Sequence, residues 1–418
     1  MYAQVADAAW RWVLSQVRWD SPEDGGLSIP ESPGVALNPD YRDGMHSGIG
    51  GLAYVLAEIR LSRPWTAEEE RLASGIVAQV SARVPCATDY NFFDGLVSAI
   101  GVLTALDADP APAVARLQDL AEPDGWPQTA FEPPRFLPGT RVTDVVLGTA
   151  GILLAAVWAD ARELGELAAD VLLAEAEEVP AGLDWAFVPA RFRTDETVRL
   201  PNFSHGVSGI STALAVAGLR FDRPDLVSAA TRGAAHLLSL GDGYVVPQRI
   251  PPGEQPVAHG WCHGGAGTSL LYVALDRAGV TSVAGAAPLE WHRRALEGVR
   301  TSGLPERLRP GFWDNDGRCC GTAGVGDIFL DSWCRAGDQE DLAFAVRLAD
   351  ALVARAFVAG PHAYWRFVEH RNPDPLLPPG VGWLQGAAGI AAFLFRVERV
   401  LRGSTAPVPR LDSWWALP

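Results

Sequence analysis

The chain has 418 residues, enough for two average domains or one large fold, and with 48% hydrophobic and 20% charged residues it resembles a globular protein with a large core. A formal net charge of −16, without a run of lysine or arginine, argues against nucleic acid and anionic membranes as partners, because both require a basic surface. No segment resembles a signal peptide or reaches membrane length, so we expect no membrane span. Five cysteines are too few for a disulfide scaffold, which favours a reducing, cytoplasmic location.

A glycine pattern recurs seven times along the chain. It consists of Gly-x-x-Gly followed by an apolar run, and its copies lie at residues 46–59, 93–106, 147–159, 204–217, 262–275, 319–332 and 384–397, the second copy being degenerate. The leading glycines of successive copies are 47 to 65 residues apart. Seven copies at such a period indicate a repeat architecture.

Each repeat also holds a second helical segment. In residues 159–179, 222–240 and 338–357, apolar side chains recur every three or four positions, with charges on the other face, which predicts amphipathic helices. The runs that follow the glycines are apolar almost all round, as expected of buried helices. Strand signals are scarce, and the best lies at 243–250. The proline-rich stretches at 134–140 and 371–380 are interpreted as ordered connecting loops.

These segments predict an all-α fold, an α/α toroid with seven inner and seven outer helices in a single domain over residues 1–418. Each repeat would run from an amphipathic outer helix through a loop and a glycine turn to a buried inner helix. A closed ring is favoured over an open solenoid, because a solenoid needs polar capping repeats and the last repeat here is as apolar as the middle ones. We expect the active site at the mouth of the inner helices, where helix N-termini offer free N–H groups.

Aligning the copies on the leading glycine brings chemically active side chains to one rim. Cys262 and Cys319 both lie two positions before that glycine, and Cys320 follows directly. His205 lies one position before it and Asp144 four positions before it, each in an earlier repeat. Three thiolates with a fourth position open are the ligand set of a catalytic zinc site. Ordinary buried thiols and a vicinal disulfide remain alternatives, the disulfide being disfavoured in a reducing compartment.

The neighbouring polar residues admit more than one role. His205 could cap a helix instead of acting in catalysis, and Asp144 could be an N-cap. His263 could be a fourth zinc ligand, a hydrogen-bond donor to a ligand or a substrate contact.

The remaining cysteines and the tryptophans near the glycine turns are expected to be structural or to border the site. Cys86 and Cys334 are interpreted as small buried side chains. Trp261, Trp313 and Trp383 each lie near a glycine turn and could line a pocket or pack it.

Four motifs resemble those of the lanthionine synthetase C-like family, the lanthipeptide cyclases. They are "DVVLGTAG" at 144–151, "NFSHGVSG" at 202–209, "GWCHGGAG" at 260–267 and "RCCGTAGVGD" at 318–327, and the sevenfold repeat is similar to the family's α/α toroid. The resemblance implies an enzyme that adds peptide cysteine thiolates to dehydroalanine or dehydrobutyrine and so forms thioether rings.

Carried over position by position, the resemblance implies a role for each rim residue. Zinc would be held by Cys262, Cys319 and Cys320, with His205 and Asp144 catalytic; for His263 we expect a substrate contact. The partner implied is a dehydrated precursor peptide, and dehydration would come from separate kinase and lyase proteins unless this sequence is an excised domain of a larger protein.

The sequence departs from the family pattern at three positions. Cys320 stands where many members have histidine, and this Cys-Cys-Gly form resembles class IV-type cyclase domains. Ala258 stands where many members have arginine, and His263 where tyrosine is frequent, so the group that polarises the carbonyl of the electrophile is not identified.

Other functions were weighed against cyclisation. One is the addition of glutathione to dehydroamino acids by a member of the same family, and another is a zinc-containing scaffold without activity that binds a peptide or a kinase. A toroidal glycosidase is disfavoured, because it needs paired carboxylates and the rim offers only Asp94 and Asp144.

Overall fold

The computed structural model describes residues 1–21, 26–128, 136–194, 199–241, 245–253, 257–306, 315–368, 376–408 and 410. The chain divides into two compact units, the first comprising Met1–Val84, Gly101–Pro110 and Ser302–Pro418, and the second Pro85–Ile100 and Ala111–Thr301. The described residues form fourteen α-helices and six short strands. The organisation as a single domain stays a prediction.

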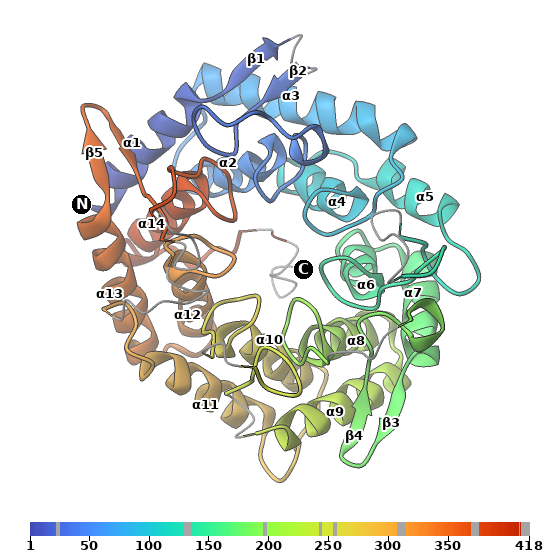
Figure 1. Ribbon diagram of the computed structural model, residues 1–418. Coiled ribbons are helices and arrows are strands. Elements are labelled where there is room, and N and C mark those ends of the chain that lie inside the picture. Colours follow the sequence, from blue (N-terminus) through green and yellow to red (C-terminus); the bar gives the residue numbers. More distant parts are fainter. Residues whose placement is uncertain are drawn as a thin grey trace. The chain divides into compact units, whose positions relative to one another are not determined.

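The second unit is built from helix pairs. Its helices are α5 (Ala111–Asp119), α6 (Thr149–Trp158), α7 (Arg162–Ala174), α8 (Val207–Phe221), α9 (Pro224–Ser239), α10 (Gly265–Arg277) and α11 (Pro288–Arg300). Helices α6, α8 and α10 each begin directly after a leading glycine, are buried nearly throughout and lie side by side (Figure 1). Each packs against the amphipathic helix that follows it, α7, α9 or α11.

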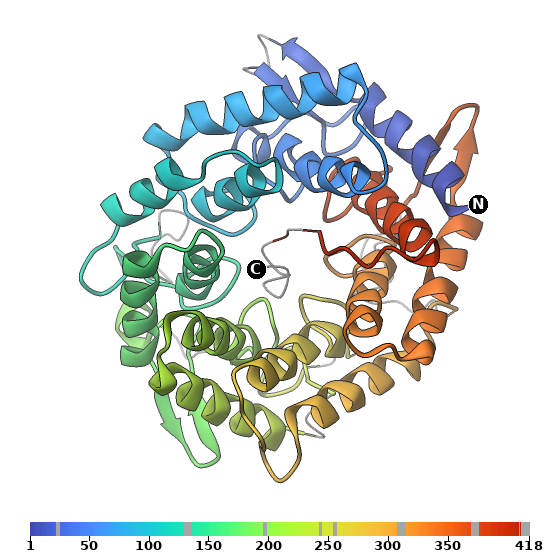
Figure 2. The same ribbon diagram turned by 180° about the vertical axis from the view of Figure 1, so that it is seen from behind.

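The first unit repeats this arrangement, with one exchange of partners. It contains α1 (Tyr2–Ser15), α2 (Leu52–Arg60), α3 (Ala67–Arg83), α12 (Thr322–Ala336), α13 (Gln339–Arg355) and α14 (Ala387–Leu401), and α4 (Leu96–Ala105) has residues in both units. Helix α12 packs against α13, whereas α14 packs most extensively against α1 (Figure 2). The expected order is therefore corrected: α6, α8, α10 and α12 each pack mainly against the amphipathic helix that follows, and α14, the last glycine-turn helix, takes its main partner from the N-terminal end.

The second glycine of the pattern is required by a close backbone approach. A Cβ atom at Gly209 would lie 1.8 Å from the carbonyl oxygen of Phe203, and one at Gly324 would lie 1.8 Å from that of Arg318. Real Cβ atoms are not found so close to an oxygen, so only glycine lets the turn fold back onto the first turn of the helix.

Strands occur only as short hairpins in the described part of the chain. The antiparallel pairs are β1 (Arg18–Ser21) with β2 (Gly26–Ser28), β3 (Glu177–Val179) with β4 (Gly182–Asp184), and β5 (Phe357–Ala359) with β6 (His362–Tyr364). The strand expected at 243–250 is wrong for residues 245–250, where only an isolated bridge joins Ile250 to Arg199, and residues 243 and 244 lie outside the described residues. The proline-rich stretches are loops where they are described, at 136–140 and 376–380.

Two of these hairpins follow an amphipathic helix and are anchored in the same way. After α7, the indole N–H of Trp185 donates to the carbonyl of Leu172, and after α13 that of Trp365 donates to the carbonyl of Leu352, both at 2.8 Å. The shared anchor shows that the repeat extends beyond the helices.

Every described helix is too short or too polar to cross a membrane.

Candidate metal centre and active site

Backbone hydrogen bonds connect the glycine turns of the second unit at one register position, two residues before the leading glycine. The N–H of Ser204 donates to the carbonyl of Cys262 at 3.0 Å, and the N–H of Val146 donates to the carbonyl of Ser204 at 3.3 Å. The N–H of Phe92, one position earlier in its own repeat, donates to the carbonyl of Val146 at 2.7 Å. Residues that the sequence alignment placed at one register position are thus joined by backbone hydrogen bonds. The bond from Ser204 to the Cys262 carbonyl holds the backbone of Cys262 in place.

The first unit continues the same pattern. The N–H of Cys319 donates to the carbonyl of Leu384, and the N–H of Leu384 donates to the carbonyl of His46, both at 3.0 Å. Arg318 also donates its N–H to the Leu384 carbonyl, at 2.8 Å. Cys319 and Cys320, the vicinal pair, are therefore held by their backbone against the neighbouring glycine turn.

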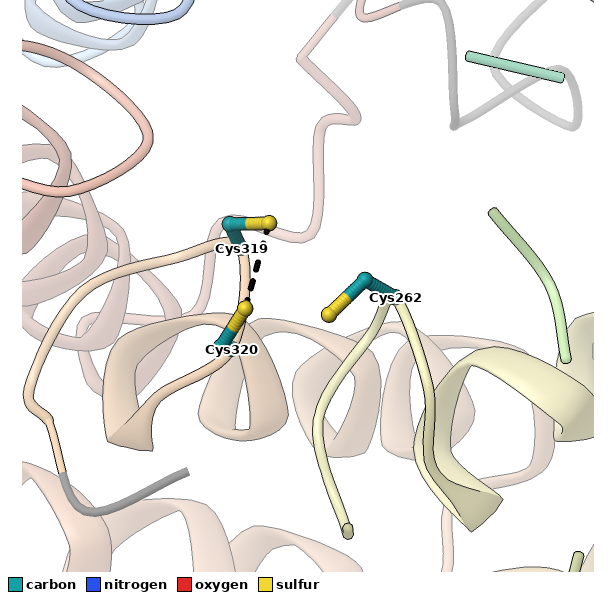
Figure 3. A group of neighbouring side chains, drawn as sticks. All are labelled: Cys262, Cys319 and Cys320. Atoms are coloured by element: carbon teal, nitrogen blue, oxygen red, sulfur yellow. Dashed lines mark hydrogen bonds between the residues drawn. The ribbon is translucent and has the colours of Figure 1, made fainter. Parts of the chain in front are cut away.

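Three cysteine side chains form the candidate metal site (Figure 3). The Sγ atoms of Cys262, Cys319 and Cys320 all lie within 4.8 Å of one another, and the three side chains are buried. All are free thiols, and the two sulfurs of the vicinal pair are 3.4 Å apart. A disulfide bond is about 2.05 Å long, so the vicinal disulfide considered above is not formed.

The spacing of the sulfurs fits a single tetrahedral ion. Zinc–thiolate bonds of about 2.3 Å at tetrahedral angles place sulfurs about 3.8 Å apart. The two sulfurs of the vicinal pair, 3.4 Å apart, are close to that spacing, and all three sulfurs lie within 4.8 Å of one another. A buried cluster of three cysteines could therefore hold a metal ion.

Asp144 and His205 are in direct contact in the second unit. Asp144 Oδ2 lies 2.6 Å from His205 Nδ1, while Asp144 Oδ1 accepts the N–H of Leu147 at 2.7 Å. Asp144 is completely buried, and the side chain of His205 is 27% exposed. Burial raises the pKa of Asp144, and the contact with His205 opposes that rise. The pair thus holds a proton between Oδ2 and Nδ1 and leaves Nε2 as the ring nitrogen available for chemistry.

Aromatic rings surround His205. The ring of His263 is 5.5 Å away between centroids, and that of Phe187 packs edge-on at 5.8 Å. His263 directly follows Cys262, so the second unit brings together one cysteine, the two histidines and Asp144. Ala258 is buried and offers no polar group.

His46 is a further residue near the metal site, and the sequence analysis did not assign it a role. It occupies the same register position as Cys319 in the same unit, and its carbonyl accepts from Leu384. Burial lowers the pKa of His46, while the nearby Cys319 and Glu31 oppose that fall. Its register position is the signal in the sequence that could have identified it.

The remaining candidates are structural. Trp261 packs against Phe203 with ring centroids 5.3 Å apart, and Trp383 packs against Tyr54 at 5.1 Å, so both are buried packing residues. Trp313 lies outside the described residues.

The expectation for the two other cysteines was partly wrong. Cys86 is exposed, because it lies in a short 3-10 turn, η3 (Val84–Cys86), after α3, and Cys334 is only half-buried.

Comparisons with known proteins agree with this fold. The chain matches the family "Lanthionine synthetase C-like protein" over residues 39–400, and comparison with curated protein sequences gives no significant match. Similar solved structures include nisin cyclase (14% identity, 91% of this chain and 94% of that chain, TM-score 0.62). Cellobiose 2-epimerase from Spirochaeta thermophila is similar at 13% identity, over 96% of this chain and 95% of that chain, with a TM-score of 0.53. The Lin0763 protein from Listeria innocua is similar at 11% identity, over 96% of this chain and 98% of that chain, with a TM-score of 0.51. At these identities the likeness concerns the fold alone, and it confirms the expected α/α toroid.

Proposed function

Since the chain belongs to the lanthionine synthetase C-like family, we propose that it is a zinc-dependent lanthipeptide cyclase. It adds cysteine thiols of a dehydrated precursor peptide to dehydroalanine or dehydrobutyrine and so forms lanthionine or methyllanthionine rings. The observation that carries the proposal is the buried group of Cys262, Cys319 and Cys320, which would supply three thiolate ligands to a zinc ion and leave a further ligand position for a substrate sulfur.

A metal ion held by the three cysteines would change the protonation state of the substrate thiol. A free cysteine thiol has a pKa of about 8.5 and is mostly protonated at neutral pH, whereas only the thiolate is a good nucleophile. Bound zinc would hold the substrate thiol in its deprotonated form. The side chains of Cys262, Cys319 and Cys320, which would hold the ion, are buried.

His205 and Asp144 handle the protons of the reaction. In the addition, a sulfur–carbon bond forms at the β-carbon, the carbon–carbon double bond is lost, and the α-carbon takes up one proton. His205 delivers this proton through Nε2, because Asp144 engages Nδ1. The thiol proton released at the start replaces it, so the cycle needs no external acid.

His263 contacts the electrophile. The ring of His263 lies beside that of His205, and the residue directly follows Cys262 in the chain. A substrate whose sulfur is bound near Cys262 would therefore present its carbonyl close to His263. Position 258 offers no donor, and His263 therefore supplies the hydrogen bond to the carbonyl on which negative charge develops.

The proposal is tested on purified protein with a dehydrated peptide that contains a cysteine. We expect about one zinc ion per chain and rings detected by mass spectrometry as products resistant to thiol alkylation. The His205→Ala variant should keep its zinc and cyclise about 10² to 10⁴ times more slowly. Folded protein without zinc would contradict the proposal, and loss of zinc in His205→Ala would make His205 a ligand. A parallel reaction with glutathione and a dehydrated peptide lacking cysteine tests the glutathione-adding alternative.

A further inference from the structure

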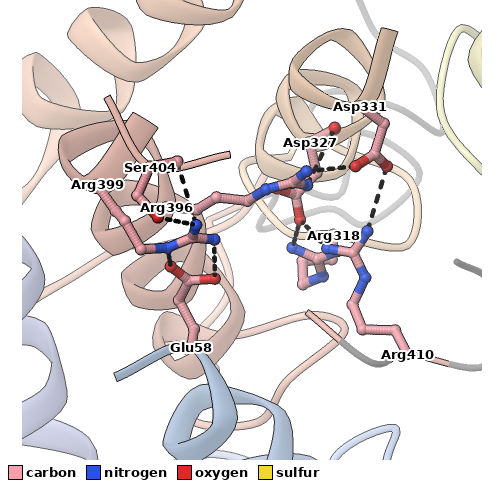
Figure 4. Close-up of polar contacts among 8 residues, drawn as sticks. All are labelled: Glu58, Arg318, Asp327, Asp331, Arg396, Arg399, Ser404 and Arg410. Atoms are coloured by element: carbon pink, nitrogen blue, oxygen red, sulfur yellow. Dashed lines mark hydrogen bonds and ion pairs between the residues drawn. The ribbon is translucent and has the colours of Figure 1, made fainter. Parts of the chain in front are cut away.

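Five charged side chains form one ion-pair network in the unit that carries the vicinal pair (Figure 4). Asp327 of α12 is contacted by Arg396 of α14 (Nη1 to Oδ1, 2.9 Å) and by Arg410 (Nη1 to Oδ2, 2.8 Å). Arg318 also pairs with Asp327, at the same Oδ2 atom that Arg410 uses. Asp331, one turn later, pairs with Arg396 and with Arg410 (Nη2 to Oδ2, 3.3 Å). The exposed fractions of these side chains lie between 3% and 10%.

Arg318 connects this network to the metal site. It directly precedes Cys319, and the N–H groups of both residues donate to the carbonyl of Leu384. Its guanidinium group lies 4.2 Å from the ring centroid of Trp383 and pairs with Asp327. Both the backbone and the guanidinium group of Arg318 are thus held in place. Because Cys319 follows directly, the position of Arg318 determines where the vicinal pair begins.

We propose that Arg410 is a positioning residue of the metal centre. By bridging Asp327 and Asp331 it holds the carboxylate oxygen that fixes Arg318, and through Arg318 it sets the position of the vicinal pair. The inference rests on the metal centre of the proposed function. Arg410 follows α14 and lies 90 residues after Cys320 in the sequence, yet by this inference it helps to shape the ligand set.

The charges of the network support this role. The network joins three guanidinium groups to two carboxylates, and each carboxylate pairs with more than one arginine. The arginines hold the pKa of Asp327 well below its usual range against the effect of burial, so this carboxylate is ionised at neutral pH.

A matched pair of arginines allows a sharp test. Arg399, on α14 in the same unit, is similarly buried, but its ion pair is with Glu58 (Nε to Oε1, 2.6 Å) and not with Asp327 or Asp331 (Figure 4). The Zn²⁺ dissociation constant is measured by competition with a chelator of known affinity in wild type, Arg410→Gln, Arg410→Lys, Arg399→Gln and Arg399→Lys. The Co²⁺–thiolate absorption spectrum and the urea midpoint are recorded for each.

Arg410→Gln should weaken Zn²⁺ binding about 10- to 100-fold, as the loss of a residue supporting metal ligands does. Arg410→Lys should lose less, because it keeps the charge but cannot bridge two carboxylates. The Arg399 variants should lower the urea midpoint and keep the dissociation constant within about threefold of wild type, since they leave the supporting residues intact.

Three results would overturn the inference. The first is an Arg410→Gln variant that binds Zn²⁺ as tightly as the wild type does. If the glutamine variant does not fold, the same result in Arg410→Lys counts instead. The second is equal weakening in the matched Arg399 variant, which would mean general loosening of the unit. The third is wild-type protein that binds no zinc, and this alone would also remove the metal centre of the proposed function.

Discussion

The Asp144→Asn substitution separates the chemistry of the Asp144–His205 contact from its structural role. Asp144 Oδ1 accepts the N–H of Leu147 and Oδ2 faces His205 Nδ1. In asparagine the oxygen stays at Leu147, because turning the amide would leave a buried donor facing a donor, at a cost of about 1–3 kcal/mol. The amide NH₂ then faces Nδ1, which must accept, so the ring proton sits on Nε2.

This tautomer cannot complete the proposed cycle. A ring that accepts at Nδ1 can neither take up a second proton there nor receive one at Nε2, so the acid that protonates the α-carbon is lost. The rate should fall about 10² to 10⁴-fold. Replacing a charge-assisted hydrogen bond by a neutral one removes about 1–1.5 kcal/mol of folding stability, and relief of the buried carboxylate offsets part of this. The free energy of unfolding should therefore change by about 1 kcal/mol or less.

The pH dependence of stability gives a second readout. Because burial raises the pKa of Asp144, the folded state binds this proton more tightly than the unfolded state does. The wild type therefore loses stability as pH rises from the unfolded carboxyl pKa through the raised one, and the asparagine variant lacks that loss. The difference in urea midpoint should shift in favour of the Asp144→Asn variant as pH rises.

The assay is cyclisation of a dehydrated peptide, with zinc content and urea unfolding measured on the same preparations. A cyclisation rate within about threefold of wild type, with zinc unchanged, would refute the reasoning, because a lost acid cannot leave the rate intact. Asp144 would then be only the cap of its turn.

Three further substitutions test other parts of the structure. Cys320→His should keep zinc but make the site less negative, so that pH–rate profiles show slower cyclisation shifted toward acid; faster cyclisation at every pH would contradict this. Gly209→Ala places a Cβ 1.8 Å from the Phe203 carbonyl oxygen and should lower the free energy of unfolding by about 1–3 kcal/mol in urea titrations. Arg399→Gln leaves Glu58 buried without its cation and should cost about 3–5 kcal/mol, most of which Glu58→Leu/Arg399→Met should restore; an equally unstable double variant would refute this.

The glycine pattern predicted much of the fold because it reports a backbone contact. Wherever a carbonyl packs against the start of a buried helix, as Phe203 does at Gly209, no side chain fits, and the sequence must show glycine. The same register aligned Cys319 with the position bonded to Leu384, which is why the metal site could be anticipated.

Other features leave no comparable local signal. The hairpin strands are three or four residues long, too short for an alternating pattern, and depend on anchors such as Trp185. The packing of α1 on α14 and the position of Arg410 arise from contacts between distant segments, which a helical period cannot encode. Cys86 shows that residue type alone does not decide burial.

The contact between α1 and α14 has a consequence for biosynthesis. The buried face of α1 includes Trp10 and Val13, and Ala3 donates its N–H to Glu398 of α14 at 3.2 Å. At ribosomal speeds of about 5–20 residues per second, α14 emerges on the order of 20–80 s after α1. During that interval the face of α1 that packs on α14 stays uncovered, and the first unit cannot reach its final packing. A chain that stalls before α14 therefore presents an exposed apolar helix, the kind of surface that chaperones bind and proteases detect.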